Sequence, residues 1–158
     1  MSTFQHTIAR STLEQIGDMT VSFGHLEFQM RWVLMYLVNQ SAIVGAILAS
    51  PLSFRSLRDV LSSLYKERFG EDKLYSELED LLKEAAKIEQ ERNAITHSDW
   101  LSGNRRHKIT SRQKGGVKIH LQEYSEKDLP EFNQRIKRLT GQFIDFYNKL
   151  PDKIPAKT

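Results

Sequence analysis

Residues 72–98 read DKLYSELEDLLKEAAKIEQERNAITHS and set the pattern for most of the chain. Apolar residues recur in this stretch every three or four positions, which is the spacing of one buried face on an α-helix. They are Leu74, Leu78, Leu81, Ala85, Ile88 and Ile95. The stretch therefore predicts a long amphipathic helix that packs against other helices.

Four further stretches are predicted to be helical: 11–38, 42–49, 53–69 and 125–150. Before the last of them, residues 108–112 and 117–124 alternate apolar and polar residues around Lys114-Gly115-Gly116, which is typical of a β-hairpin. We therefore expect an all-α fold. It would be an antiparallel bundle of about four main helices, with a small β-hairpin inserted before the last helix.

The length and composition of the chain limit what it can be. Its 158 residues suit one domain, 1–158, with a core over about 11–150 and the hairpin insert at about 101–124. The chain has no cysteine, which excludes a disulfide scaffold, a thiolate zinc site and a cysteine nucleophile. It has no secretory signal pattern and no apolar run long enough to span a membrane. We therefore expect a cytoplasmic protein with no membrane partner.

Two charged residues fall on faces that should be buried. Arg92 lies almost at the centre of the apolar stripe of residues 72–98, and Glu27 falls on the stripe of residues 11–38. An arginine keeps its charge and is rarely left unpaired in a core, so we expect Glu27 to hold Arg92. Such a pair could simply fix the register of two helices, because desolvation cancels most of its attraction. Its position next to a histidine also fits a functional site.

His97 lies where this helix ends, four residues after Asn93 on an adjoining flank. An imidazole gains and loses a proton near neutral pH, which suits proton transfer, although a histidine at a helix C-terminus can equally serve as a cap. Together with Arg92, His97 offers a proton shuttle and an anion clamp. Neither His107 nor His120 has the spacing of a metal ligand, and no phosphate-binding loop is present, so we expect no metal and no cofactor.

The hairpin segment is basic. No acidic residue occurs between Asp99 and Glu123, whereas six residues there are candidates for binding nucleic acid: Arg105, Arg106, Lys108, Arg112, Lys114 and Lys118. A run of charge is usually only a solvated surface. This run leaves directly from the Arg92–His97 segment, so it would place phosphate-binding charge beside the candidate site.

The segment Arg92-Asn93-Ala94-Ile95-Thr96-His97 resembles the R-x4-6-H motif of HEPN domains, in which an Asn often follows the Arg. The surroundings are similar too, with a long first helix that bears an acidic residue and a final amphipathic helix. The resemblance covers about residues 11–150. It implies a helical bundle that forms a homodimer, in which two copies of the motif face each other and cleave RNA without a metal.

The resemblance also implies roles for single residues. Arg92 would stabilise charge on the scissile phosphate, His97 would act as general acid or base, and Asn93 would orient the substrate or the histidine. Many relatives are toxins or antiviral effectors with a neighbouring antitoxin protein, and others are non-catalytic binding modules. We therefore expect a metal-independent endoribonuclease of toxin or phage-defence type. The alternatives are a HEPN-like module that binds nucleic acid or protein, and a helical dimer whose polar cluster only sets register.

Overall fold

Five helices make up most of the chain that the structure describes. The computed structural model describes residues 8–97, 99–100, 105–112, 116–123 and 127–152. The helices are α1 (Arg10–Val38), α2 (Ala42–Ala49), α3 (Phe54–Phe69), α4 (Lys73–Thr96) and α5 (Asp128–Asn148). The chain is therefore helical where the spacing of its apolar residues predicts helices. In the described ranges, no helix combines the length and apolar composition of a membrane span.

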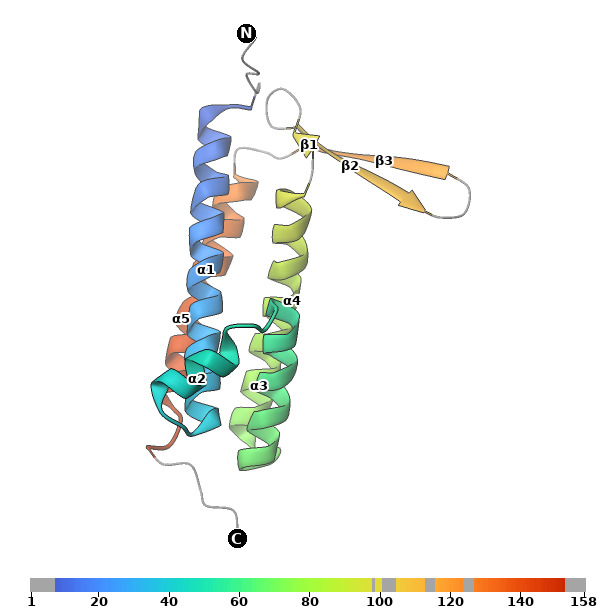
Figure 1. Ribbon diagram of the computed structural model, residues 1–158. Coiled ribbons are helices and arrows are strands. Elements are labelled where there is room, and N and C mark those ends of the chain that lie inside the picture. The colour runs from blue at the N-terminus through green and yellow to red at the C-terminus, as the bar shows by residue number, and fades with distance from the viewer. Residues whose placement is uncertain (1–7, 98, 101–104, 113–115, 124–126, 153–158) are drawn as a thin grey trace.

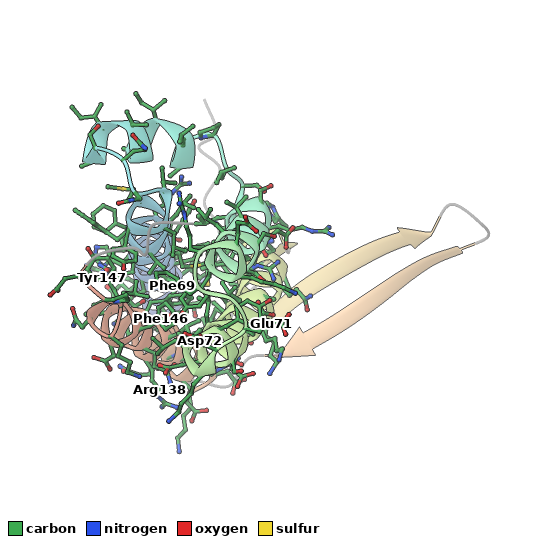
Figure 2. All side chains as sticks on the ribbon, turned by 90° about the horizontal axis from the view of Figure 1, so that it is seen from below. Phe69, Glu71, Asp72, Arg138, Phe146 and Tyr147 are labelled. Carbon is green, nitrogen blue, oxygen red and sulfur yellow. The ribbon has the colours of Figure 1, made fainter. Side chains whose placement is uncertain are left out.

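Four of these helices surround one core, in the order α1, α3, α4 and α5 (Figures 1 and 2). α1 packs against α3 and α5, and α4 packs against the same two helices, so α1 and α4 lie diagonally opposite each other. The core is filled by the predicted apolar stripes. Its largest fully buried side chains include Tyr65, Phe132, Phe143, Phe146, Met19, Leu26, Met30 and Leu34.

The direction of the helices corrects the expectation of an antiparallel bundle. Near its N-terminus α1 accepts a hydrogen bond from Asn133 of α5 at the carbonyl of Gln15, and near its C-terminus Tyr36 contacts Tyr147, so α1 and α5 run in parallel. α3 is also parallel to α1, and α4 alone runs against the other three. The reason is that the connection over residues 39–53 contains α2 and carries the chain back along α1, whereas a short turn would have forced neighbouring helices to alternate.

α2 packs on α1 through its small residues. Gly45 and Ala49 are its buried residues, and a Cβ at Gly45 would come within 2.9 Å of Cγ of Met35. Ser41 caps its N-terminus by accepting a hydrogen bond from the backbone N–H of Val44. This close contact leaves the large apolar side chains of α2 on its outer side.

In the sequence, three strands follow α4 and precede α5, and they form an antiparallel sheet with the strand order β1-β2-β3. β1 (Asp99–Trp100) pairs with the start of β2 (Arg105–Arg112), and β2 pairs along its length with β3 (Gly116–Glu123). The sequence alternation indicated strands over 108–112 and 117–124, so β2 begins three residues earlier than expected. In Figure 1, β2 and β3 project from the bundle as an arm.

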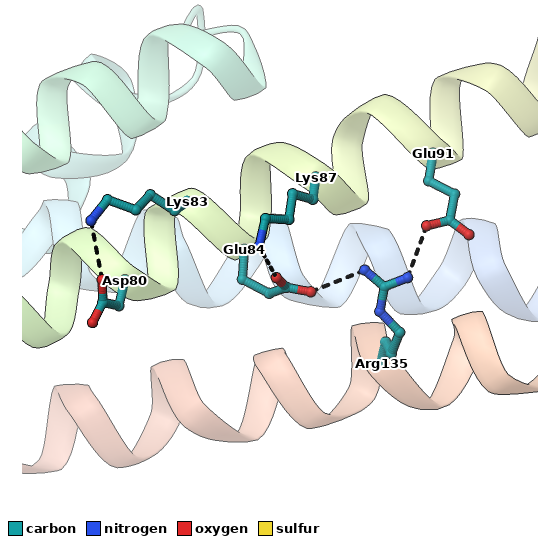
Figure 3. Close-up of polar contacts among 6 residues, drawn as sticks. All are labelled: Asp80, Lys83, Glu84, Lys87, Glu91 and Arg135. Carbon is teal, nitrogen blue, oxygen red and sulfur yellow. Dashed lines mark hydrogen bonds and ion pairs between the residues drawn. The ribbon is translucent and has the colours of Figure 1, made fainter.

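A network of ion pairs joins α4 to α5 (Figure 3). Arg135 of α5 donates hydrogen bonds to Glu84 at 3.0 Å and to Glu91 at 2.8 Å, and Lys87 pairs with Glu84 at 3.2 Å. The hydrogen bond from Arg135 holds the pKa of Glu84 below its ordinary value, against an opposing effect of burial. Because these side chains are partly exposed, the network adds little to the free energy of unfolding, and its main effect is to orient α5 against α4.

Candidate functional site

Arg92 lies on the inner side of α4 and reaches across the core toward α1. Its guanidinium carbon is 4.9 Å from the centre of the Phe23 ring, which is a cation–π contact. Its Nη1 donates a hydrogen bond to Oδ1 of the neighbouring Asn93 at 2.8 Å. The buried Nε has no hydrogen-bond partner. The positive charge is thus held by an aromatic face and an amide, neither of which neutralises it.

Glu27 does not hold Arg92, contrary to the expectation from the apolar stripes. Its Oε1 accepts a hydrogen bond from Nη2 of Arg31 at 2.6 Å, one turn further along the same helix. Arg31 also donates to the backbone carbonyls of Ala49 and Leu52, so the pair ties α1 to the end of α2. The prediction was wrong because a cation four residues away on the same helix is the nearest partner.

His97 ends α4 and has an exposed side chain. Its backbone N–H donates to the carbonyl of Asn93 at 3.0 Å, which closes the last turn of the helix. Trp100 folds back over this turn, and its Nε1 donates to the carbonyl of Ile95 at 3.1 Å. The imidazole is therefore exposed to solvent at a helix end that is held by two hydrogen bonds, one from the backbone of His97 and one from the Trp100 indole.

The Arg92–His97 segment brings two of its three polar side chains together. Arg92 and Asn93 are hydrogen bonded, whereas His97 lies five residues after Arg92, about 140° further around the helix. Arg92 is half-buried and faces the core, while His97 is exposed. In one chain, the guanidinium and the imidazole therefore point in different directions.

The strands connect the basic arm to the end of α4. Trp100, three residues after His97, pairs with Arg106, and Asp99 pairs with His107. Arg105 and Lys108 lie on either side of this contact, whereas Arg112 is six residues further along β2, about 20 Å away. Lys118 lies in β3 and pairs with Thr110. Lys114 falls outside the described residues. Arg105, Arg106 and Lys108 thus lie at the end of β2 that pairs with Trp100, and Arg112 and Lys118 lie further along the arm.

Phe23 and Trp100 are the contacts that sequence reasoning missed. Phe23 lies on the apolar stripe of residues 11–38, and apolar spacing alone does not show that its ring packs against the Arg92 guanidinium. Trp100 follows His97 by three residues, and an indole directly after a helix end is a visible signal for a cap on the last carbonyls. Both residues stabilise the C-terminal end of α4, Phe23 through its contact with Arg92 and Trp100 through its hydrogen bond to Ile95.

Acidic and histidine side chains do not gather into a metal site: within the described ranges, no three such residues are placed to hold an ion. The positions of Arg92, Asn93 and His97 can also be set against known proteins. Comparison of the chain with family models, with curated proteins and with solved structures finds no match. The geometry of the site is therefore the basis for a functional proposal.

Proposed function

We propose that this protein is a cytoplasmic, metal-independent endoribonuclease of toxin or phage-defence type that works as a homodimer. Arg92 would stabilise the negative charge that develops on the scissile phosphate, and His97 would transfer a proton as general acid or base. Asn93 would hold the guanidinium in place. The basic residues of β2 and β3 would bind the RNA backbone on either side of the cleaved bond.

The observation that carries this proposal is the exposed imidazole of His97, which follows the Arg92 guanidinium by five residues at the same helix end. Among the residues whose side chains the structure describes, no carboxylate pairs with Arg92. Placing a cation where phosphate charge increases in the transition state is a large source of catalysis. The pairing of Trp100 with Arg106 places a basic residue of β2 opposite a residue that follows His97 by three positions.

The different directions of Arg92 and His97 favour a site that two chains share. On one α4 the two side chains are separated by about 140°, so a single phosphate does not easily meet both of them. Two copies of α4 that meet at their C-terminal ends would allow His97 of one chain to act with Arg92 of the other. This arrangement is also what the HEPN resemblance implies.

RNA cleavage in the presence of a chelator tests the proposed activity. We expect the purified protein to cleave mixed RNA in EDTA, because protons and an arginine do the chemistry, and to leave 2′,3′-cyclic phosphate ends. The ends are identified by mass spectrometry of the fragments. Cleavage that requires added Mg²⁺, or that leaves 5′-phosphate ends, would contradict the proposal.

A second candidate function is supported by the contacts of Arg92 itself. Its guanidinium lies over Phe23 and is bonded to Asn93, as a residue that only stabilises the helix end would be. In that case the protein would bind nucleic acid through β2 and β3 without cleaving it. His97 would then serve only as the C-cap of α4.

The salt dependence of RNA binding tests this second function. Neutralising Arg105, Arg106 and Lys108 should weaken binding and reduce the slope of log affinity against log salt by up to about 2, because each lost contact to a single strand removes about 0.7. Fluorescence anisotropy with a labelled RNA measures both quantities. A matched control neutralises three exposed cations on the helices: Arg55, Lys73 and Arg138. Equal effects of the two triple variants would exclude a specific role for the arm.

A further inference from the structure

The outer side of α1 carries a second apolar stripe that faces away from the core. Val21 is 60% exposed, Phe28 53% and Trp32 40%. These residues are seven and four positions apart, so they share one face of the helix, opposite the buried stripe of Met19, Phe23, Met30 and their neighbours. A helix of a monomeric bundle normally carries polar residues on this side.

α2 continues this apolar surface. Its small residues face the protein, and its large ones face outward, with Ile43 74% exposed and Ile47 65% exposed. Val44 and Leu48 are also exposed. A helix that buries glycine and alanine but exposes isoleucine is unusual for a surface in contact with water alone, and it is typical of a surface that binds another protein. We call the surface of Val21, Phe28, Trp32, Ile43 and Ile47 the α1–α2 outer face.

The α1–α2 outer face has no formal charge. No residue of α2 is charged, and the exposed residues of α1 between 17 and 32 include no acid, lysine or arginine. They are Gly17, Thr20, Val21, Gly24, His25, Phe28 and Trp32. Arg31, at its border, is already paired with Glu27. A nucleic acid needs cations to replace its counterions, so this face does not suit one. An uncharged apolar face can, in contrast, meet an identical face without repulsion.

The shape of the α1–α2 outer face also suits a two-fold interface with the same face of a second chain. A groove of about 310 Å³ is lined by Phe28, Trp32 and Met35 of α1, by Ala46, Ala49 and Ser50 at α2, and by Arg31, whose charge is paired with Glu27. Ile43 and Ile47 project from α2 beside this groove. A two-fold interface requires each copy to offer both the projection and the hollow that receives it. At Gly17 and Gly24 an added Cβ would meet nothing within 4 Å, so the upper part of the stripe is flat and open.

We infer that the α1–α2 outer face binds the same face of a second copy of this chain. Its large apolar side chains expose an area on the order of 500 Å². A standard interface takes about 800 Å² from each partner, and the exposed Val44 and Leu48 of α2, with Gly17 and Gly24 of α1, add to this area. The face is thus of the size that a stable dimer needs.

This contact is distinct from a shared site at the end of α4, and the inference does not rest on the proposed function. Because α1 and α4 lie diagonally across the bundle, and α2 lies outside α1, the α1–α2 outer face points away from α4 (Figure 2). A dimer formed on it leaves both copies of His97 free on its outer sides. If the ends of α4 also meet in pairs, the complete assembly contains at least four chains.

Light scattering on the purified full-length chain tests the inference. We expect the wild-type protein to have a mass of at least twice the 18.4 kDa of one chain. Ile47→Glu should halve that mass, because a carboxylate in an apolar interface is costly. Phe28→Glu on α1 should have the same effect. Ser63→Glu, which adds the same charge to an exposed position of α3, should leave the mass unchanged. Circular dichroism checks that each variant keeps its helices.

The result separates this inference from the proposed nuclease. A change from dimer to monomer or from tetramer to dimer supports the interface, whether or not the protein cleaves RNA. A wild-type protein that is monomeric at all concentrations overturns it, and the face then serves a different protein. A mass that Ile47→Glu and Phe28→Glu both leave unchanged also overturns it. Loss of RNA cleavage without a change in mass bears only on the proposed function.

Discussion

Replacing His97 with alanine is expected to slow RNA cleavage by about 10²- to 10⁴-fold, which is the usual contribution of a positioned acid or base. His97 is exposed at the end of α4, and its side chain makes no hydrogen bond to another described residue, so removing it should leave the fold intact. The rate is measured on a labelled RNA in EDTA, with the wild-type and variant proteins purified in the same way. Thermal unfolding checks that the variant is as stable as the wild type.

His25→Ala is the matched control for this experiment. His25 is also an exposed histidine on a helix, but it lies on the outer side of α1, which faces away from α4. We expect it to cleave RNA at the wild-type rate. If His97→Ala cleaves as fast as His25→Ala, then the activity comes either from another part of the chain or from a contaminating nuclease, and His97 is not a catalytic residue.

Phe143→Ala is expected to lower the free energy of unfolding by about 3–5 kcal/mol, since it removes a ring from the fully buried core and leaves a cavity. Phe143 is 0% exposed and lies on α5, which makes the most extensive contact with α1. A loss of this size is a large part of the stability of a typical domain. Urea unfolding at a fixed protein concentration, followed by circular dichroism, measures it.

The neighbouring Ile144 gives the control on the same helix. It is 41% exposed, so Ile144→Ala removes a side chain that is only partly packed. We expect a loss within about 1 kcal/mol for this variant. Equal losses for the two variants would mean that α5 does not bury the face that the structure assigns to it.

Sequence reasoning located the helices because each buried stripe repeats with the period of an α-helix. It failed on their directions. Nothing in the apolar spacing shows that the connection containing α2 returns the chain along α1, and that return makes α1, α3 and α5 parallel. Direction depends on the path of a connection in space, which the periodicity of the helices does not record.

The candidate site was predicted in part, for a similar reason. Arg92, Asn93 and His97 lie together at the end of α4 as the sequence indicated, but the partner of Arg92 is the ring of Phe23. The pairing of Glu27 with Arg31 was visible as an i,i+4 pair and outweighs a contact across the bundle. The outer stripe of α1 does not follow from its buried stripe, because Val21, Phe28 and Trp32 repeat with the same helical period on the opposite side.

The different directions of Arg92 and His97 at the end of α4 have a consequence for how activity depends on protein concentration. If the active site forms only where two chains meet, its population depends on association, which follows mass action. In dilute conditions the number of sites then rises with the square of the protein concentration, so doubling the protein produces about four times the activity. Above the dissociation constant of the dimer, the number of sites becomes proportional to the protein concentration. The activity per chain would therefore depend on the abundance of the protein only at low expression.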